Sequence, residues 1–148
     1  MTTTSPVPIA SLTAAPLDGD ALLACFEDAT LPNRDFHHAD HVRVVWEYLE
    51  RFPPAEAQAR FTTALRRYAT ANGAPEKYHE TITLLYFFLI VERRARLEEG
   101  HEWEGFAAAS ADLLAWKNGL LERYYRPETL ASDLARRVFV LPDAGRAA

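Results

Sequence analysis

The sequence predicts an all-α protein, a single-domain bundle of five or six helices that ends in an extended C-terminal tail. Three observations predict this fold class. Apolar residues recur at the three- and four-residue spacing of amphipathic helices in several segments of the 148-residue chain. Helix start and stop signals flank these segments. Before the tail, no stretch of useful length shows the alternation of apolar and polar residues that is typical of a strand.

The N-terminal part of the chain divides into an arm and a first helix. Residues 1–16 are rich in Thr, Ser, Pro and Ala, and we expect them to form a flexible arm. Residues 17–148 are then expected to form a single helical domain. Within it, Leu22, Leu23 and Phe26 have helical spacing and predict the first helix.

Two further helices follow a loop that contains proline and asparagine. The second begins at His37 or His38 and ends near Arg51, because apolar residues form one stripe along it. The third has clear signals at both ends. Pro54 suits the first helical turn, where its missing N–H costs no hydrogen bond, and Gly73 suits the left-handed position after the helix.

The second half of the sequence predicts a central helix, two more helices and the tail. Residues 76–98 are apolar nearly all round, which is typical of a helix covered on several sides. Residues 106–125 predict a fifth helix with an interruption near residues 118–119. A short final helix opens at Pro127, and the β-branched residues and proline of residues 138–143 favour an extended conformation.

Composition excludes several classes of function. The net charge of −5 and the scattered arginine pairs argue against a nucleic-acid-binding surface. Cys25 is the only cysteine, so neither an internal disulfide nor a CxxC metal site is expected. The first dozen residues lack the features of a secretory signal. The longest apolar run is far shorter than the ~20 residues of a membrane span, so we expect a cytoplasmic protein with no membrane partner.

Four of the five histidines fall in two short stretches, and these stretches predict a metal site. His38 and His41 are three residues apart and His37 and His41 are four apart, so either pair lies on one helix face. His79 lies at the start of the fourth helix, beside Glu80. Two imidazoles from one helix and a third from another would suit Zn, Fe, Cu or Ni, with a coordination position left open for water or substrate.

Other interpretations of the same residues stay open. In a metal-free site, His79 or His41 would act as acid or base beside a carboxylate. In a structural role, the histidines would cap and bridge helices. In the metal site, Asp40 or Glu47 would orient a ring N–H from outside the coordination sphere. The fifth histidine, His101, falls in a polar interhelical stretch and is left out of the predicted site.

Three stretches of the sequence together resemble a family of small, uncharacterised bacterial helical proteins. These are "FHHADHVRVVWEYL", "GAPEKYHETITLLYFFLI" and "LASDLARRVFVLPD", and the resemblance covers nearly the whole chain after residue 20. The family's F-x-H-x-x-H-V…W element matches Phe36, His38 and His41. The resemblance therefore favours His38 over His37 as the partner of His41.

The other two elements of the family also have matches. Its Y-H-E-T-(I/L)-T element corresponds to residues 78–83. Its S-x-x-x-R…FVLPD element corresponds to Ser132, Arg136 and residues 139–143. The resemblance narrows the residues of the site and implies no particular reaction.

The predicted function is a metal-dependent enzyme that acts on a small molecule. Glu80 and His79 would carry catalysis, and Tyr78 and Arg136 would bind the substrate, since a guanidinium suits a carboxylate. A salt bridge that pins the tail would explain Arg136 equally well. Alternatives are a metal-free His/Glu acid–base enzyme and a non-catalytic binding protein for a metal or small ligand. A homodimer is a further expectation for a helical bundle. The predicted metal ligands are His38, His41 and His79.

Overall fold

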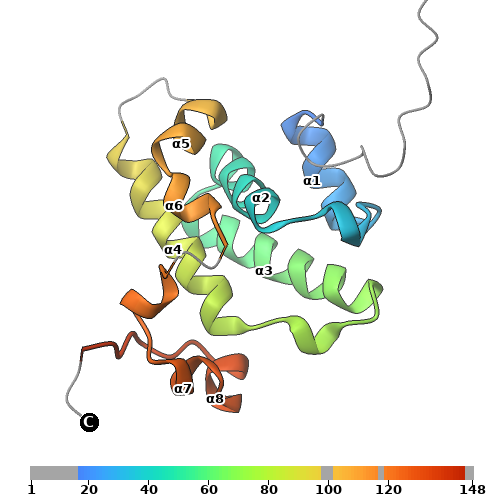
Figure 1. Cartoon of the computed structure of the whole chain (residues 1–148). Coiled ribbons are helices and arrows are strands. Elements are labelled where there is room, and N and C mark those ends of the chain that lie inside the picture. The colour runs from blue at the N-terminus through green and yellow to red at the C-terminus, as the bar shows by residue number, and fades with distance from the viewer. Residues whose placement is uncertain (1–16, 98–101, 117–118, 146–148) are drawn as a thin grey trace, which may run out of the picture. The chain divides into compact units, whose positions relative to one another are not determined.

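The computed structural model describes residues 17–97, 102–116 and 119–145, and in these residues the protein is all-α, with eight α-helices (Figure 1). This confirms the predicted fold class. The chain forms two compact units, residues 1–75 and 76–148, and each is described by itself. The predicted N-terminal arm and the stretch around His101 lie outside the described residues. None of the described helices has the length and apolar character needed to cross a membrane.

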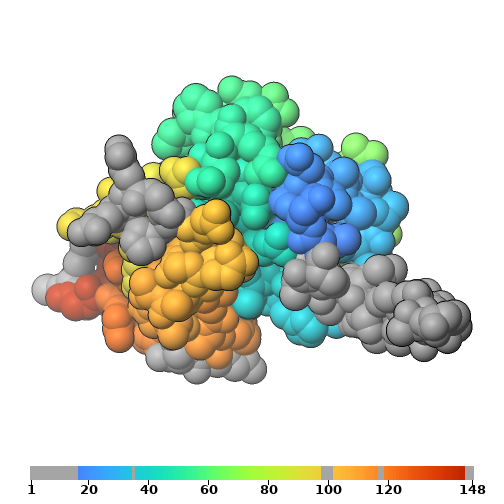
Figure 2. Space-filling model, turned by 90° about the horizontal axis from the view of Figure 1, so that it is seen from above, coloured from blue at the N-terminus to red at the C-terminus, as the bar shows by residue number. Residues whose placement is uncertain are grey.

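The first unit is a cluster of three helices. α1 (Gly19–Glu27), α2 (His38–Arg51) and α3 (Pro54–Ala71) all pack against one another. Figure 2 shows the outer surface of α1, in blue, next to α2, in blue-green. Asp18 begins α1 by accepting a hydrogen bond from the Ala21 N–H at 2.8 Å. Buried side chains from all three helices form the core, among them Leu22, Phe26, Val45, Tyr48, Phe61 and Tyr68.

Both ends of α3 fall where the sequence predicts them. Pro54 occupies the first helical position, where it removes an N–H that has no partner within the helix. At the other end Asn72 is the C-cap, and Gly73 follows with a φ of 73°. Glycine adopts this left-handed conformation without the steric cost of a Cβ atom. Local sequence signals therefore fix the length of this helix.

The second unit is built around one long helix. α4 (Glu80–Arg96) packs against α8 (Asp133–Arg137), and α7 (Pro127–Leu130) also contacts α8 (Figure 1). Two short helices, α5 (Trp103–Ala109) and α6 (Ala111–Leu114), contact each other. The buried side chains of this unit include Leu84, Leu85, Phe87, Ile90, Phe106, Leu113 and Tyr125.

Three boundaries in the second unit differ from the prediction. A 3₁₀ turn at Pro75–Lys77 precedes α4, so the helix starts at Glu80 and not at residue 76. The predicted fifth helix is divided because Ser110, with φ −127° and ψ 40°, leaves the helical conformation between α5 and α6. The final helix is also divided, because the Ser132 side chain accepts a hydrogen bond from the Ala135 N–H and starts α8 anew.

Candidate functional site

The histidines of the first unit lie at the start of α2. His38 is the first residue of the helix and His41 follows one turn later, both half-buried. His37 precedes the helix with 69% of its side chain exposed, and its backbone N–H donates to Asp40 Oδ2 at 2.9 Å. Burial, with a smaller contribution from His38, lowers the pKa of His41 to about 3. His38 and His41 are thus both half-buried, whereas the His37 side chain is mostly exposed.

The His41 ring lies against an aromatic side chain and has no hydrogen bond with the part of the chain that the structure describes. Its centroid is 4.2 Å from that of the Phe36 ring, and the two planes are 23° apart. The residues that the structure describes provide no hydrogen-bond partner for either ring nitrogen of His41. A half-buried imidazole without such a partner keeps its nitrogens available to a ligand or to water.

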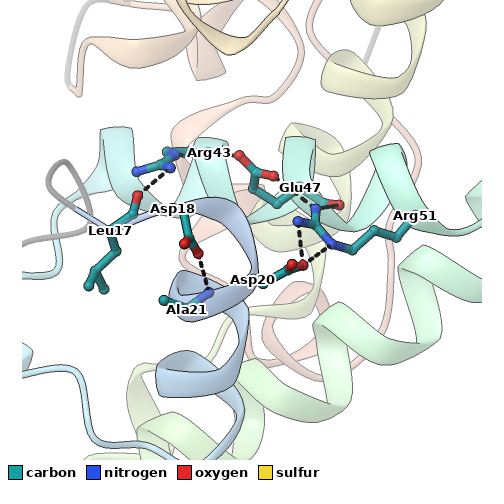
Figure 3. A network of polar contacts seen from close by, with 7 residues as sticks. All are labelled: Leu17, Asp18, Asp20, Ala21, Arg43, Glu47 and Arg51. Atoms are coloured by element: carbon teal, nitrogen blue, oxygen red, sulfur yellow. Dashed lines mark hydrogen bonds and ion pairs between the residues drawn. The ribbon is translucent and has the colours of Figure 1, made fainter.

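A network of charged side chains lies further along α2 (Figure 3). Arg51 donates to Asp20 Oδ1 through Nε and Nη2, at 3.0 and 2.7 Å, and to Glu47 Oε1 through Nη1 at 2.8 Å. On the other side of Glu47, Arg43 lies 3.5 Å away and donates to the Leu17 carbonyl at 2.6 Å. These contacts hold the start of α1 on α2.

The same network lies close to Gly19, the first residue of α1, so a larger residue there would require the Glu47 and Arg51 side chains to move. A Cβ atom on Gly19 would lie only 2.2 Å from Glu47 Oε1. The carboxylate of Glu47 is thus held between two arginines beside α1, and that of Asp40 accepts from the His37 backbone. Neither is hydrogen-bonded to the ring of His41, so the predicted role of orienting that ring has no support in either contact.

His79 belongs to the second unit and is used at both ring nitrogens. As the N-cap of α4, it accepts a hydrogen bond from the Ile82 N–H through Nδ1 at 3.1 Å. Its Nε2 lies 2.8 Å from the carbonyl of Leu130, the last residue of α7. Because an N–H only donates and a carbonyl only accepts, this arrangement requires the lone pair on Nδ1 and the proton on Nε2. His79 would have to give up one of these bonds to bind a metal.

A His79→Ala variant is expected to lower the free energy of unfolding by about 1–3 kcal/mol, because it removes the N-cap acceptor and the tie to Leu130 together. His79→Asn should recover about half of this loss, since asparagine caps helices well. Urea unfolding measures both. Lys77→Ala provides a control and should change stability by less than about 0.5 kcal/mol, because the Lys77 side chain is exposed. Equal stability of His79→Ala and wild type would contradict the capping role.

The other predicted residues of this unit are also engaged in local bonds. The Tyr78 phenol donates to Glu80 Oε1 at 2.6 Å. Arg136 is exposed, and its Nη1 donates to the carbonyl of Glu76. Arg136 is therefore hydrogen-bonded to backbone, whereas the sequence predicts either a substrate carboxylate or a salt bridge as its partner.

Thr81 joins the two C-terminal sequence elements of the resemblance. Its hydroxyl is fully buried, donates to the Val138 carbonyl at 2.9 Å and accepts from the Val140 N–H at 3.1 Å. The extended residues 138–143 are thereby held on the first turn of α4. This use of Thr81 could not be recognised from the sequence, because its partners lie almost 60 residues away.

Asp143 closes the same segment against α7. Its carboxylate accepts from the Arg126 N–H at 3.0 Å and from the Thr129 hydroxyl. The hydrogen bond from Thr129 is the main reason that the pKa of Asp143 is lowered. The Tyr125 hydroxyl donates to the Val140 carbonyl at 2.5 Å. The FVLPD element is thus hydrogen-bonded to residues 125–129 and helps to stabilise this unit.

No protein-family model, curated protein or solved structure matches this chain. Within residues 17–97, 102–116 and 119–145, no group of three or more His, Cys, Asp or Glu side chains lies in a position to hold a metal ion. The histidines differ sharply in what they already bind: both nitrogens of His79 have partners, and those of His41 have none among the described residues.

Proposed function

We propose that the protein binds a transition-metal ion through His38 and His41 and uses it in a reaction on a small molecule. The observation that carries this proposal is the His41 ring, which is fixed against Phe36 but makes no hydrogen bond with a described residue. His38 lies one turn before it on the same helix. Ring nitrogens in this arrangement favour Zn, Fe, Cu or Ni over Mg or Ca, which prefer oxygen ligands.

Two protein ligands leave coordination positions for water and substrate, and the bound metal would supply Lewis-acid or oxygen-activating chemistry. The sequence predicts His79 as a third ligand, and metal binding there would require the release of its bond to Leu130 or to the Ile82 N–H. The sequence also predicts Glu80 as the base, and within the second unit the Tyr78 phenol donates a hydrogen bond to its carboxylate.

A metal-free acid–base enzyme is the second candidate, and the contact between Tyr78 and Glu80 favours it. In that case the chemistry falls to Glu80 and His79. A base works best when its pKa is close to the working pH. The pKa of about 3 makes His41 a weak base, so it would not take that role.

Metal content measured by elemental mass spectrometry tests the proposal. Tag-free wild-type protein, reconstituted with Zn, Fe, Cu and Ni in turn, is expected to retain about one ion per chain, because neutral imidazoles bind these metals well. His38→Ala and His41→Ala should lose it. His37→Ala is the matched control and should retain it, since the His37 side chain is mostly exposed. Absence of metal in all samples, or equal content in all, would contradict the proposal.

The same series separates the remaining alternatives. Loss of metal in His79→Ala would assign the third ligand, whereas retention would leave His79 with the structural role of its two hydrogen bonds. X-ray absorption then distinguishes an enzyme from a binding protein. Oxygen from water in the coordination sphere indicates an open site, and a shell filled by protein nitrogen indicates a non-catalytic one.

A further inference from the structure

Phe36 has a place in the first unit that its apolar character alone does not explain. It follows the 3₁₀ turn Asn33–Asp35 and directly precedes the histidines of α2. One face of its ring covers the His41 imidazole, with the centroids 4.2 Å apart. On other sides it contacts Phe26, at 5.4 Å between centroids, and the edge of Tyr68, at 5.0 Å.

This packing restricts the orientation of the His41 ring. The Phe36 side chain is buried among other aromatic rings, so it has little freedom to turn. A ring stacked on it at 23° is held in a nearly parallel plane. The lone pair of an imidazole nitrogen lies in the plane of its ring. Phe36 therefore sets the plane in which a ligand can reach the nitrogens of His41.

We propose that Phe36 is a positioning residue for the metal site, because its ring holds the His41 imidazole in the plane from which it binds the ion. This inference rests on the proposed function. It adds that the affinity depends on a residue that contacts no metal. Without the stacked ring, His41 would lose side-chain freedom only on binding, and that loss would weaken the complex.

Zinc affinity of matched variants tests this inference. Phe36→Leu keeps an apolar side chain but removes the flat ring, and it is expected to raise the dissociation constant for Zn²⁺ about 3- to 10-fold. Phe36→Tyr restores a flat ring and should bind within about twofold of wild type. Phe61→Leu is the control: it lies in the same aromatic cluster, 6.1 Å from Phe26, without contacting His41.

The positioning role and a merely structural role predict different patterns. If Phe36 positions His41, Phe61→Leu should lower stability about as much as Phe36→Leu, but leave the Zn²⁺ affinity within about twofold of wild type. With Co²⁺ as the probe, the visible spectrum should change in Phe36→Leu and not in Phe61→Leu. Equal weakening of Zn²⁺ binding in the two leucine variants would overturn the positioning role.

A measurement on the wild-type protein keeps the inference testable if Phe36→Leu does not fold. The stacked Phe36 ring should shift the His41 ring protons upfield in the NMR spectrum, and this shift should persist when Zn²⁺ is added. Loss of the shift on Zn²⁺ binding would overturn the inference and leave the metal site intact. No Zn²⁺ binding at all would overturn both, whereas normal binding by Phe36→Leu with loss in His41→Ala would overturn the inference alone.

Discussion

A Thr81→Val variant is expected to unfold with a free energy about 2–3 kcal/mol below that of wild type. Thr81 has no exposed surface, and its hydroxyl both donates to the Val138 carbonyl and accepts from the Val140 N–H. Valine has nearly the same shape as threonine, so it fills the same space. The loss therefore reports the two hydrogen bonds and not a cavity.

The expected magnitude follows from what the substitution leaves behind. One carbonyl and one N–H lose their partner, and each such group costs about 1–3 kcal/mol when it is buried. Val138 is exposed and Val140 half-buried, so water replaces part of the lost bonding, which places the total at the lower end. Urea unfolding gives the free energy, and faster amide exchange at Val140 would locate the change.

Thr83 offers a matched control for this variant. It lies two residues further along α4, is half-buried, and makes no side-chain hydrogen bond with a described residue. Thr83→Val should therefore change stability by less than about 0.5 kcal/mol. Thr81→Ser, which keeps the hydroxyl, should recover most of the loss. If Thr81→Val and Thr83→Val were equally stable, the residues 138–143 would not depend on Thr81.

The helices of the first unit could be predicted because local signals mark their ends. Pro54 and Gly73 delimit α3, and the apolar stripe of α2 begins next to the histidines. In the second unit the ends depend on side chains that usually lack such a role. Histidine is not a typical N-cap, yet His79 starts α4 by accepting from a backbone N–H. Ser110 divides the predicted fifth helix in a similarly unexpected way.

The sequence shows how the candidate histidines are spaced along their helices, but not which hydrogen bonds and ring contacts they make. The choice of His38 over His37 stays a prediction; α2 begins at His38, and the His37 side chain before it is 69% exposed. Helical spacing could not show that His79 bonds to the carbonyl of Leu130, 51 residues away. Nor could it show that the Phe36 ring stacks on the His41 imidazole, because this contact depends on how the chain turns into α2.

Sequence elements that look catalytic can therefore be structural in part. His79 and Thr81 come from one element of the resemblance, and both bond to backbone of the C-terminal segment. Arg136, from the C-terminal element, donates a hydrogen bond to the Glu76 carbonyl. In this unit the polar residues at the start of α4 join backbone segments that are far apart in the sequence, whereas the His41 ring has no hydrogen bond with a described residue.

Metal-free protein is expected to lose stability as the pH falls below about 6.5, because His41 stays neutral in the folded state. Its pKa is lowered to about 3 by burial, whereas a histidine in the unfolded chain titrates near ~6.5. Between these values the unfolded state binds a proton that the folded state does not, so lower pH favours unfolding. The expected slope is about 1.4 kcal/mol per pH unit, or about 3 kcal/mol by pH 4.

The window from pH 4.5 to 6.5 separates this effect from that of the carboxylates. A hydrogen bond from Arg93 lowers the pKa of Asp112 to about 2. The pKa of Asp143 is also lowered, mainly by the hydrogen bond from Thr129. Stability that comes from these groups is lost only below ~3.9, where unfolded carboxylates take up protons. Urea unfolding across this window should therefore show a free energy of unfolding that falls with decreasing pH. In His41→Gln this dependence on pH should be much weaker. A midpoint near 6.5 in the NMR titration of His41 would show instead that the ring is solvated, and the acid sensitivity would then have another origin.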